Sequence, residues 1–545
     1  MDNRRIVGRI SNSRSRNSKK APLTLKWGGR PYKNKNKVIN IPENTKLVNG
    51  ILVAKDEGKT VSASNLNIKN LIVVNEGTQF LCSKKRRSKQ TGTKHQCNEE
   101  NSASENSLEL FNGYSPMNDL WFSPLQVFGS PGLTELFSFY VQETSQIFIV
   151  SNSGNTVNPF KTTLPQMAIE NKIVMKLLAV LGGQHRKKFG YQTDRIEEDK
   201  VMKQLYDESL LELERRVVDP QEKFSFVTLA CILILASIDI FFDQKQGLWR
   251  THLYGAKDIL LEKLKRNSEW TDVVSQRQKI SYSVGEDRES FLTRWFMYLN
   301  VISLLSSPKA TRQAEIFQEM DLDFCPSADR NNNLLAREDL KDIQPTSGME
   351  PRILAYLSRI SQMVFEKDKI TSANGMEELM TQAIELDYEI SNYLVTSERE
   401  RDEVLKRVQP TTKNLRIYQF LRCTNLLFGL TALLLLRRRI LNLSQRTTLV
   451  KELLTRISAL LRDKVPLNSP AESCLLLCIF SCGCELIDSS LVSLRDVYIR
   501  HLDSLMKGGI SGAKIAKTVM EECWETGLPW WEVLKTRKQH ISFAI

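Results

Sequence analysis

Apolar residues recur at spacings of three and four along the chain from about Leu108 onward. This period matches one face of an α-helix, so the pattern predicts a body made of helices. The most apolar stretch, residues 224–242, contains a single acid, Asp239, and has no polar face, which predicts a helix buried on every side. A polar turn at 243–247 precedes a second, amphipathic helix over 248–264. We expect this pair to lie at the centre of the fold.

The same period predicts the remaining helices, separated by polar segments. Residues 267–288 and 309–348 are polar and are predicted to be loops. Helices are predicted over 133–141, up to 181 before Gly182-Gly183, and over 202–217, 291–305, 352–394 (one or two), 415–443, 449–461, 471–487, 491–506, 511–524 and around Trp530-Trp531. The fold class is therefore all-α, a large helical bundle or array over residues 107–545.

Residues 1–106 differ from this body and are predicted to form a basic head and linker, disordered for the most part. The first 100 residues hold 22 Lys and Arg against 7 Asp and Glu. Their net charge, 22 − 7 = +15, exceeds the +13 of the whole chain. Runs rich in β-branched residues at 51–54 and 71–74 predict a few short strands. The charge suits a polyanionic partner, such as nucleic acid, an import receptor or a membrane surface; a solvated tail is an equal alternative.

A short basic run in the head is the one candidate binding patch. It is the right size for a nuclear-import signal or a phosphate contact, although such runs are common on protein surfaces. Its residues are Lys84, Lys85, Arg86, Arg87 and Lys89.

Neither a membrane span nor a disulfide framework is predicted. The uncharged stretches 224–238 and 423–436 fall short of the roughly 20 residues that cross a bilayer, so both are expected to be core helices. The N-terminus has no apolar segment of the kind found in secretory signals. Ten cysteines in 545 residues, several of them inside apolar helices, indicate free thiols in a reducing compartment.

Candidate chemistry is sparse. The five histidines are scattered, and His252 is better interpreted as a packing residue than as a proton-transfer group. Cys474, Cys478 and Cys482 fall at i, i+4 and i+8, which favours a helix–helix seam over a metal site. We therefore predict no catalytic, cofactor-binding or metal-binding residues and no enzyme, and a small-molecule binder ranks last among the hypotheses.

Several blocks resemble the regulatory domain of fungal zinc-cluster (Zn2Cys6) transcription factors. Residues 158–168 are similar to its NPF…LPLA signature, and 249–256 (Trp-Arg-Thr-His-Leu-Tyr-Gly-Ala) to its W-R-x-H-L-x-G-A block. Residues 174–182, 291–299 and 519–544 also resemble family segments, in the family's order. The likeness covers about 133–545 and is to the branch that contains arginine- and lysine-pathway regulators.

The resemblance implies a nuclear, all-helical regulator of RNA polymerase II genes, with metabolic genes as the expected targets. A complete member carries a six-cysteine cluster with two zinc ions, whereas only Cys82 and Cys97 precede residue 231 here. A truncated gene model and a real loss of the zinc module both remain open; residues 23–27 are similar to the segment that follows the cluster. Zinc is expected only in a complete member.

The expected partners follow from this difference. DNA would be bound directly only with a zinc module restored, and otherwise by weak non-specific contact. The transcription machinery, a related factor, or a homodimer or heterodimer are the other expected partners. The alternative function is a scaffold or co-regulator that does not bind DNA. Target genes, the direction of regulation and the inducing metabolite stay open.

Overall fold

Two short strands are the described part of the head. The computed structural model describes residues 45–48, 51–54, 131–151, 158–189, 195–242, 247–271, 288–308, 337 and 339–544. Strands β1 (Thr45–Val48) and β2 (Ile51–Ala54) pair antiparallel with Val48 opposite Ile51. The strand expected at 51–54 is therefore present, whereas 71–74 and the basic run at 84–89 lie outside the described residues.

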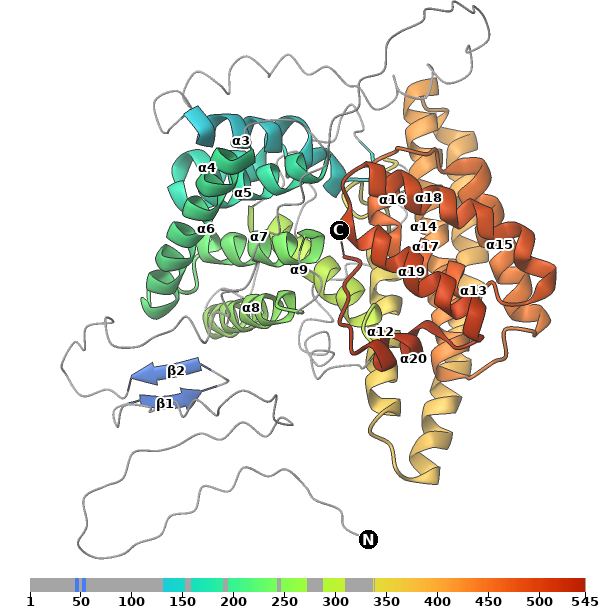
Figure 1. The fold of residues 1–545 in the computed structure, drawn as a ribbon. Coiled ribbons are helices and arrows are strands. Elements are labelled where there is room, and N and C mark those ends of the chain that lie inside the picture. The colour runs from blue at the N-terminus through green and yellow to red at the C-terminus, as the bar shows by residue number, and fades with distance from the viewer. Residues whose placement is uncertain are drawn as a thin grey trace, which may run out of the picture. The chain divides into compact units, whose positions relative to one another are not determined.

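The rest of the described chain is helical, as predicted. Figure 1 shows a first group of helices, α3 to α9, and a second group, α12 to α20. The elements are α3 (Pro131–Gln142), η4 (Thr144–Phe148), α4 (Thr163–Glu170), α5 (Lys172–Phe189), α6 (Arg195–Val218), α7 (Phe226–Phe242), α8 (Trp249–Thr271), α9 (Arg288–Leu305), α12 (Pro351–Lys367), α13 (Ala373–Val408), α14 (Thr412–Leu435), η7 (Leu436–Ile440), α15 (Thr448–Lys464), α16 (Ala471–Cys474), α17 (Leu476–Cys484), η8 (Ser489–Leu494), α18 (Arg495–Lys507), α19 (Ser511–Thr526) and α20 (Trp530–Arg537).

Helix α7 is the buried centre that the sequence predicts. Its residues are buried from Thr228 to Phe241, and it contacts α5, α8 and α9. The acid inside it, Asp239, lies with one carboxylate oxygen 3.1 Å from Nε2 of His252 on α8. Trp249, at the first position of α8, is 1% exposed. The contact between Asp239 and His252 therefore links the two helices of the pair.

The predicted end of a helix at Gly182-Gly183 is wrong, because α5 runs through both glycines to Phe189. A Cβ atom at position 182 would lie 2.6 Å from the backbone oxygen of Leu136 on α3. A Cβ atom at position 183 would collide with the sulfur of Met202 on α6. The glycines allow three helices to approach closely, and this packing outweighs their weak preference for ending a helix.

Other element boundaries also differ from the prediction. Helix α8 continues to Thr271 and enters the predicted loop at 267–288. The predicted helix over 471–487 breaks at Leu475, which separates α16 from α17. Residues 339–348, predicted to be loop, are an ordered connection with several buried side chains. The boundary near residue 106 lies outside the described residues and stays a prediction.

One helical stretch, Thr412–Ile440, is long and apolar enough to cross a membrane by length and composition. It is longer than the 14 uncharged residues of its sequence suggest, because the helix continues through Arg437, Arg438 and Arg439. In its most apolar window 83% of the residues are buried inside the protein. Burial by neighbouring helices is typical of a core helix, in agreement with the prediction.

Hydrogen bonds join the two groups of helices. The Ser511 hydroxyl at the start of α19 donates to the carbonyl of Phe241 at the end of α7. Tyr298 on α9 donates to the carbonyl of Cys474, with an O···O distance of 3.4 Å. The hydroxyl oxygens of Ser303 and Ser542 lie 2.6 Å apart. The last described residues therefore dock on α9.

Candidate functional site

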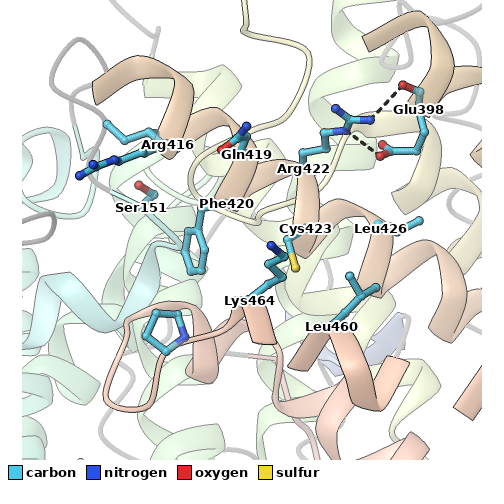
Figure 2. A pocket seen from close by; sticks show the side chains of 12 residues that line it. Ser151, Glu398, Arg416, Gln419, Phe420, Arg422, Cys423, Leu426, Leu460 and Lys464 are labelled. Atoms are coloured by element: carbon cyan, nitrogen blue, oxygen red, sulfur yellow. Dashed lines mark hydrogen bonds and ion pairs between the residues drawn. The ribbon is translucent and has the colours of Figure 1, made fainter. Parts of the chain in front are cut away.

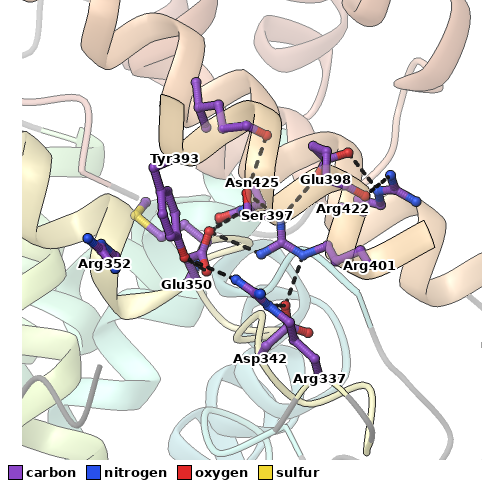
Figure 3. A network of polar contacts seen from close by, with 12 residues as sticks. Arg337, Asp342, Glu350, Arg352, Tyr393, Ser397, Glu398, Arg401, Arg422 and Asn425 are labelled. Atoms are coloured by element: carbon purple, nitrogen blue, oxygen red, sulfur yellow. Dashed lines mark hydrogen bonds and ion pairs between the residues drawn. The ribbon is translucent and has the colours of Figure 1, made fainter. Parts of the chain in front are cut away.

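A buried arginine lies where α13, α14 and the connection before α12 meet (Figure 3). The side chain of Arg401 is fully buried on α13. Its Nε donates to Oδ2 of Asp342 at 2.9 Å, its Nη2 lies 3.0 Å from Oε1 of Glu350, and its Nη1 donates to Oε1 of Glu398 at 2.9 Å. One cation thus joins three carboxylates, two of which come from the connection.

The two buried carboxylates, Asp342 and Glu350, also accept hydrogen bonds from neutral side chains. Tyr418 donates to the other oxygen of Asp342 at 2.9 Å, and Tyr393 donates to Oε2 of Glu350 at 2.6 Å. Asn425 donates from its side chain to Oε1 of Glu350 at 2.9 Å and accepts from the backbone N–H of Glu350 at 2.9 Å. These hydrogen bonds offset part of the cost of burying the two carboxylates.

A second arginine, Arg337, also links the connection to α13. Arg337 is nearly buried and pairs with Glu400 on α13. Its Nε also lies 3.7 Å from Oδ2 of Asp342. Both arginines therefore fasten the connection to the same helix.

The electrostatics of the network keep it ionised. Burial acts to raise the pKa of Glu350, but the charge of Arg401 and hydrogen bonds from Tyr393, Asn425 and Arg401 outweigh it, so the pKa is lowered overall. For Arg401, burial acts to lower the pKa, while the carboxylates of Glu350 and Asp342 bring it well above its usual value. Burial and the charge of Glu350 raise the pKa of Tyr393, so that phenol remains a donor.

A pocket of about 480 Å³ adjoins the network (Figure 2). Glu398 belongs both to the network and to the lining of the pocket, and so does its partner Arg422. The Nε of Arg422 donates to Oε2 of Glu398 at 2.6 Å. Arg422 also donates to Asp402 at 2.7 Å. The other lining residues are Ser151, Arg416, Ile417, Gln419, Phe420, Cys423, Leu426, Leu460, Lys464 and Pro466.

The lining combines apolar side chains with cations. Arg416 and Lys464 are exposed, whereas Ile417 and Leu426 are buried. Burial raises the pKa of the Cys423 thiol to about 12, so this sulfur is protonated and is not activated as a nucleophile. The pocket therefore presents apolar surface beside the exposed cations of Arg416 and Lys464.

Three histidines of the described residues, His185, His252 and His501, make contacts outside this site. His501 has Nδ1 2.6 Å from Oε1 of buried Glu472. His185 lies between the hydroxyl of Thr144 and the carbonyl of Gly508, each at 3.1 Å. His252 faces Asp239, as described above. Each ring thus bridges two elements of the helical core.

The cysteines of α16 and α17 lie at seams between helices. Cys474, Cys478, Cys482 and Cys484 are all buried. The sulfur of Cys482 lies 3.6 Å from the hydroxyl of Thr431 on α14. Within the described part of the chain, no group of three or more His, Cys, Asp and Glu is placed to hold a metal ion.

Sequence reasoning missed the arginine network, although one signal was available. Arg401 continues the buried stripe of α13 through Ile390, Leu394 and Ser397, at spacings of four, three and four. A charged residue in register with an apolar stripe must find partners inside the protein. Two of its partners, Asp342 and Glu350, lie 59 and 51 positions away, however, and spacing alone does not identify them.

Comparison with known proteins gave one match. A family model described as "Fungal specific transcription factor domain" matches residues 135–544, which includes both groups of helices. No curated protein and no solved structure matches the chain.

Proposed function

The chain belongs to the family of the fungal-specific transcription factor domain, and we propose that it regulates transcription by RNA polymerase II in the nucleus, at genes of metabolism. The observation that carries the proposal is the extent of the match, which spans residues 135–544. The site agrees with a regulatory role, because its arginine network fixes one arrangement of helices and its pocket offers binding groups. The protein acts through what it binds.

Recruitment to a promoter tests the regulatory claim directly. The full chain is fused to a heterologous DNA-binding module and placed upstream of a reporter gene. We expect reporter output to rise or fall relative to the DNA-binding module alone. Output equal to that of the module alone, with the fusion present in the nucleus at the same level, contradicts the proposal.

The proposed contact with DNA is electrostatic and independent of sequence. The 22 Lys and Arg in the first 100 residues suit phosphates rather than base edges. We expect the full chain to bind unrelated duplexes with equal affinity and to lose that affinity steeply as salt rises. Zinc-dependent binding to one sequence in preference to others would contradict this part of the proposal.

Nuclear entry is proposed to depend on the basic run of the head. Replacing Lys84, Lys85, Arg86, Arg87 and Lys89 with Gln should shift a fluorescently tagged full chain from the nucleus to the cytoplasm. The matched control replaces Lys33, Lys35 and Lys37, which lie in the same head. Nuclear accumulation unchanged in the first variant would refute this assignment.

A second candidate is a scaffold or co-regulator that uses the same helical domain. The observation behind it is that the family match, residues 135–544, lies in the helical part of the chain, which can bind a protein partner without contacting DNA. In that case the chain without a fused DNA-binding module should occupy promoters only in cells that also contain a family member with a zinc cluster. Occupancy that persists after the relative is deleted would rule the co-regulator out.

A further inference from the structure

Helix α13 has an apolar stripe on each of two faces. The inner stripe is buried and packs in the protein; it comprises Leu379, Ala383, Leu386, Ile390, Leu394 and Val404, with Ser397 and Arg401 in register. The outer stripe is exposed to solvent: Ile384 is 61% exposed, Tyr388 74% and Val395 66%. A helix at the surface of a globular protein normally has one apolar face, so the outer stripe needs an explanation.

The three outer residues lie on one side of the helix. At about 100° per residue, Ile384, Tyr388 and Val395 point within about 40° of one another. Helix α13 contacts α12, α14 and η7, which lie against its inner side. In Figure 1 the turn between α12 and α13 stands apart from the other labelled helices. Aligned exposed apolar residues mark a surface that another molecule covers.

We propose that this outer face of α13 binds α13 of a second copy of the chain, antiparallel, with the two-fold axis at Tyr388. The charges flanking the stripe identify the occupant. Glu377 and Arg399 lie eleven positions before and after Tyr388, on the same face of the helix and with opposite charge. An antiparallel two-fold pair places residue i opposite the residue equally far beyond the axis, so Glu377 faces Arg399 of the second copy twice.

The apolar residues fit the same arrangement. Tyr388 packs against its own counterpart at the axis, where two aromatic rings can stack. Val395 falls opposite position 381 and next to Ile384 of the second copy, so the exposed aliphatic side chains cover each other. An unrelated partner helix would have no reason to match charges placed symmetrically about one residue of this chain.

The flanking charges are available for this contact. Glu377 and Arg399 are both exposed, and neither has an ion-pair partner among the described residues. A single helix face is smaller than the roughly 800 Å² per partner of a standard interface. We therefore expect a dimer that dissociates on dilution rather than an obligate one.

Sedimentation velocity of the full chain over a hundredfold range of concentration tests the proposal. The wild-type protein should shift from monomer to dimer as its concentration rises. Tyr388→Asp should weaken association at least about tenfold, because it buries two like charges at the axis. The matched control Leu211→Asp replaces a residue on α6 that is 65% exposed, and it should associate as the wild type does.

A charge exchange tests the register. Glu377→Arg alone should weaken the dimer several-fold because it sets Arg against Arg399 of the second copy, and Arg399→Glu alone should weaken it similarly. The double variant should restore association to within about twofold of the wild type, because both pairs are re-formed with reversed sign. Both residues are exposed, so neither change should affect folding, and circular dichroism checks this.

Three outcomes would overturn the proposal. The first is a wild-type chain that stays monomeric over the whole range. The second is a dimer that survives Tyr388→Asp, which would place the contact elsewhere in the chain. The third is a double charge variant as weak as the single ones, which would exclude the antiparallel pairing. Rescue by the double variant supports the second copy as the occupant and excludes a heterologous helix.

Discussion

Two buried arginines in the same group of helices are stabilised in opposite ways. Arg401 is surrounded by the carboxylates of Asp342, Glu350 and Glu398, which bring its pKa well above the usual value. Arg439 is also buried, but its Nη atoms donate to the carbonyls of Leu305 at 3.1 Å and Ser307 at 3.3 Å. Burial lowers the pKa of Arg439 to about 10. Arg401 contacts three carboxylates directly, whereas the direct hydrogen bonds of Arg439 go to neutral carbonyls and the carboxylates of Asp368 and Glu532 act on it only from a distance.

The surroundings of Arg439 explain how a cation is stabilised there without a carboxylate in direct contact. Leu305 is the last residue of α9, so its carbonyl lies at the negative end of the helix dipole. The guanidinium carbon also lies 5.0 Å from the ring centroid of Trp530 and 5.6 Å from that of Trp531. Aromatic faces and partial charges stabilise a cation more weakly than ions do, but removing the cation leaves no buried charge behind.

The largest effect is expected for Arg401→Met. This change leaves the carboxylates of Asp342 and Glu350 buried without their cation, which should cost about 3–5 kcal/mol of the free energy of unfolding. Urea unfolding followed by circular dichroism measures the loss. The control is Arg446→Met at an exposed arginine, which should leave the midpoint unchanged. A loss for Arg401→Met below about 1 kcal/mol would contradict the account of the network.

Glu350→Gln should have a smaller effect that depends on pH. At neutral pH it removes charge-assisted hydrogen bonds worth about 1.5–3 kcal/mol. The pKa of Glu350 lies below its ordinary 4.5 in the folded protein, so its contribution to stability is present above that pH and is lost as the pH falls through the folded value.

The gap in unfolding free energy between wild type and Glu350→Gln should therefore narrow as the solution is acidified below 4.5. Denaturant titrations at a series of pH values measure the gap. Glu525→Gln, at an exposed carboxylate, is the control. A gap of constant size would show that the carboxylate of Glu350 is not held ionised by the network.

A still smaller loss, about 1–2 kcal/mol, is expected for Arg439→Met. The methionine fills the space under the two indole rings, and only neutral carbonyls lose their donor. The same urea experiment compares it with Arg401→Met. Equal losses for the two variants would remove the distinction between the two buried arginines.

Lys406→Ala should give no measurable change in stability. The ion pair of Lys406 with Glu403 has an N···O distance of 2.8 Å, but both side chains are mostly exposed and solvent screens their attraction. This variant sets the lower limit of the series in the same unfolding assay. A clear loss would show that burial is not what separates the strong ionic contacts of this protein from the weak ones.

The helical class and the order of the helices could be predicted because apolar spacing reports directly on which faces are buried. The family match over 135–544 likewise confirms the resemblance noted over 133–545. Tertiary contacts were not predictable in the same way. Positions 437, 438 and 439 are three consecutive arginines with different partners. Arg437 pairs with Asp387, Arg438 pairs with Glu485, and Arg439 donates to backbone carbonyls. Partners so far apart in the chain leave no periodic signal.

The glycine pair of α5 shows that two identical neighbours can differ in what evolution allows at each. At position 182 the obstacle is the backbone oxygen of Leu136, which cannot move without shifting α3. At position 183 the nearest obstacle is the end of the flexible side chain of Met202. In related sequences, substitutions should therefore be more frequent at position 183 than at position 182. A substitution at position 182 would then indicate that α3 and α5 pack differently in that relative.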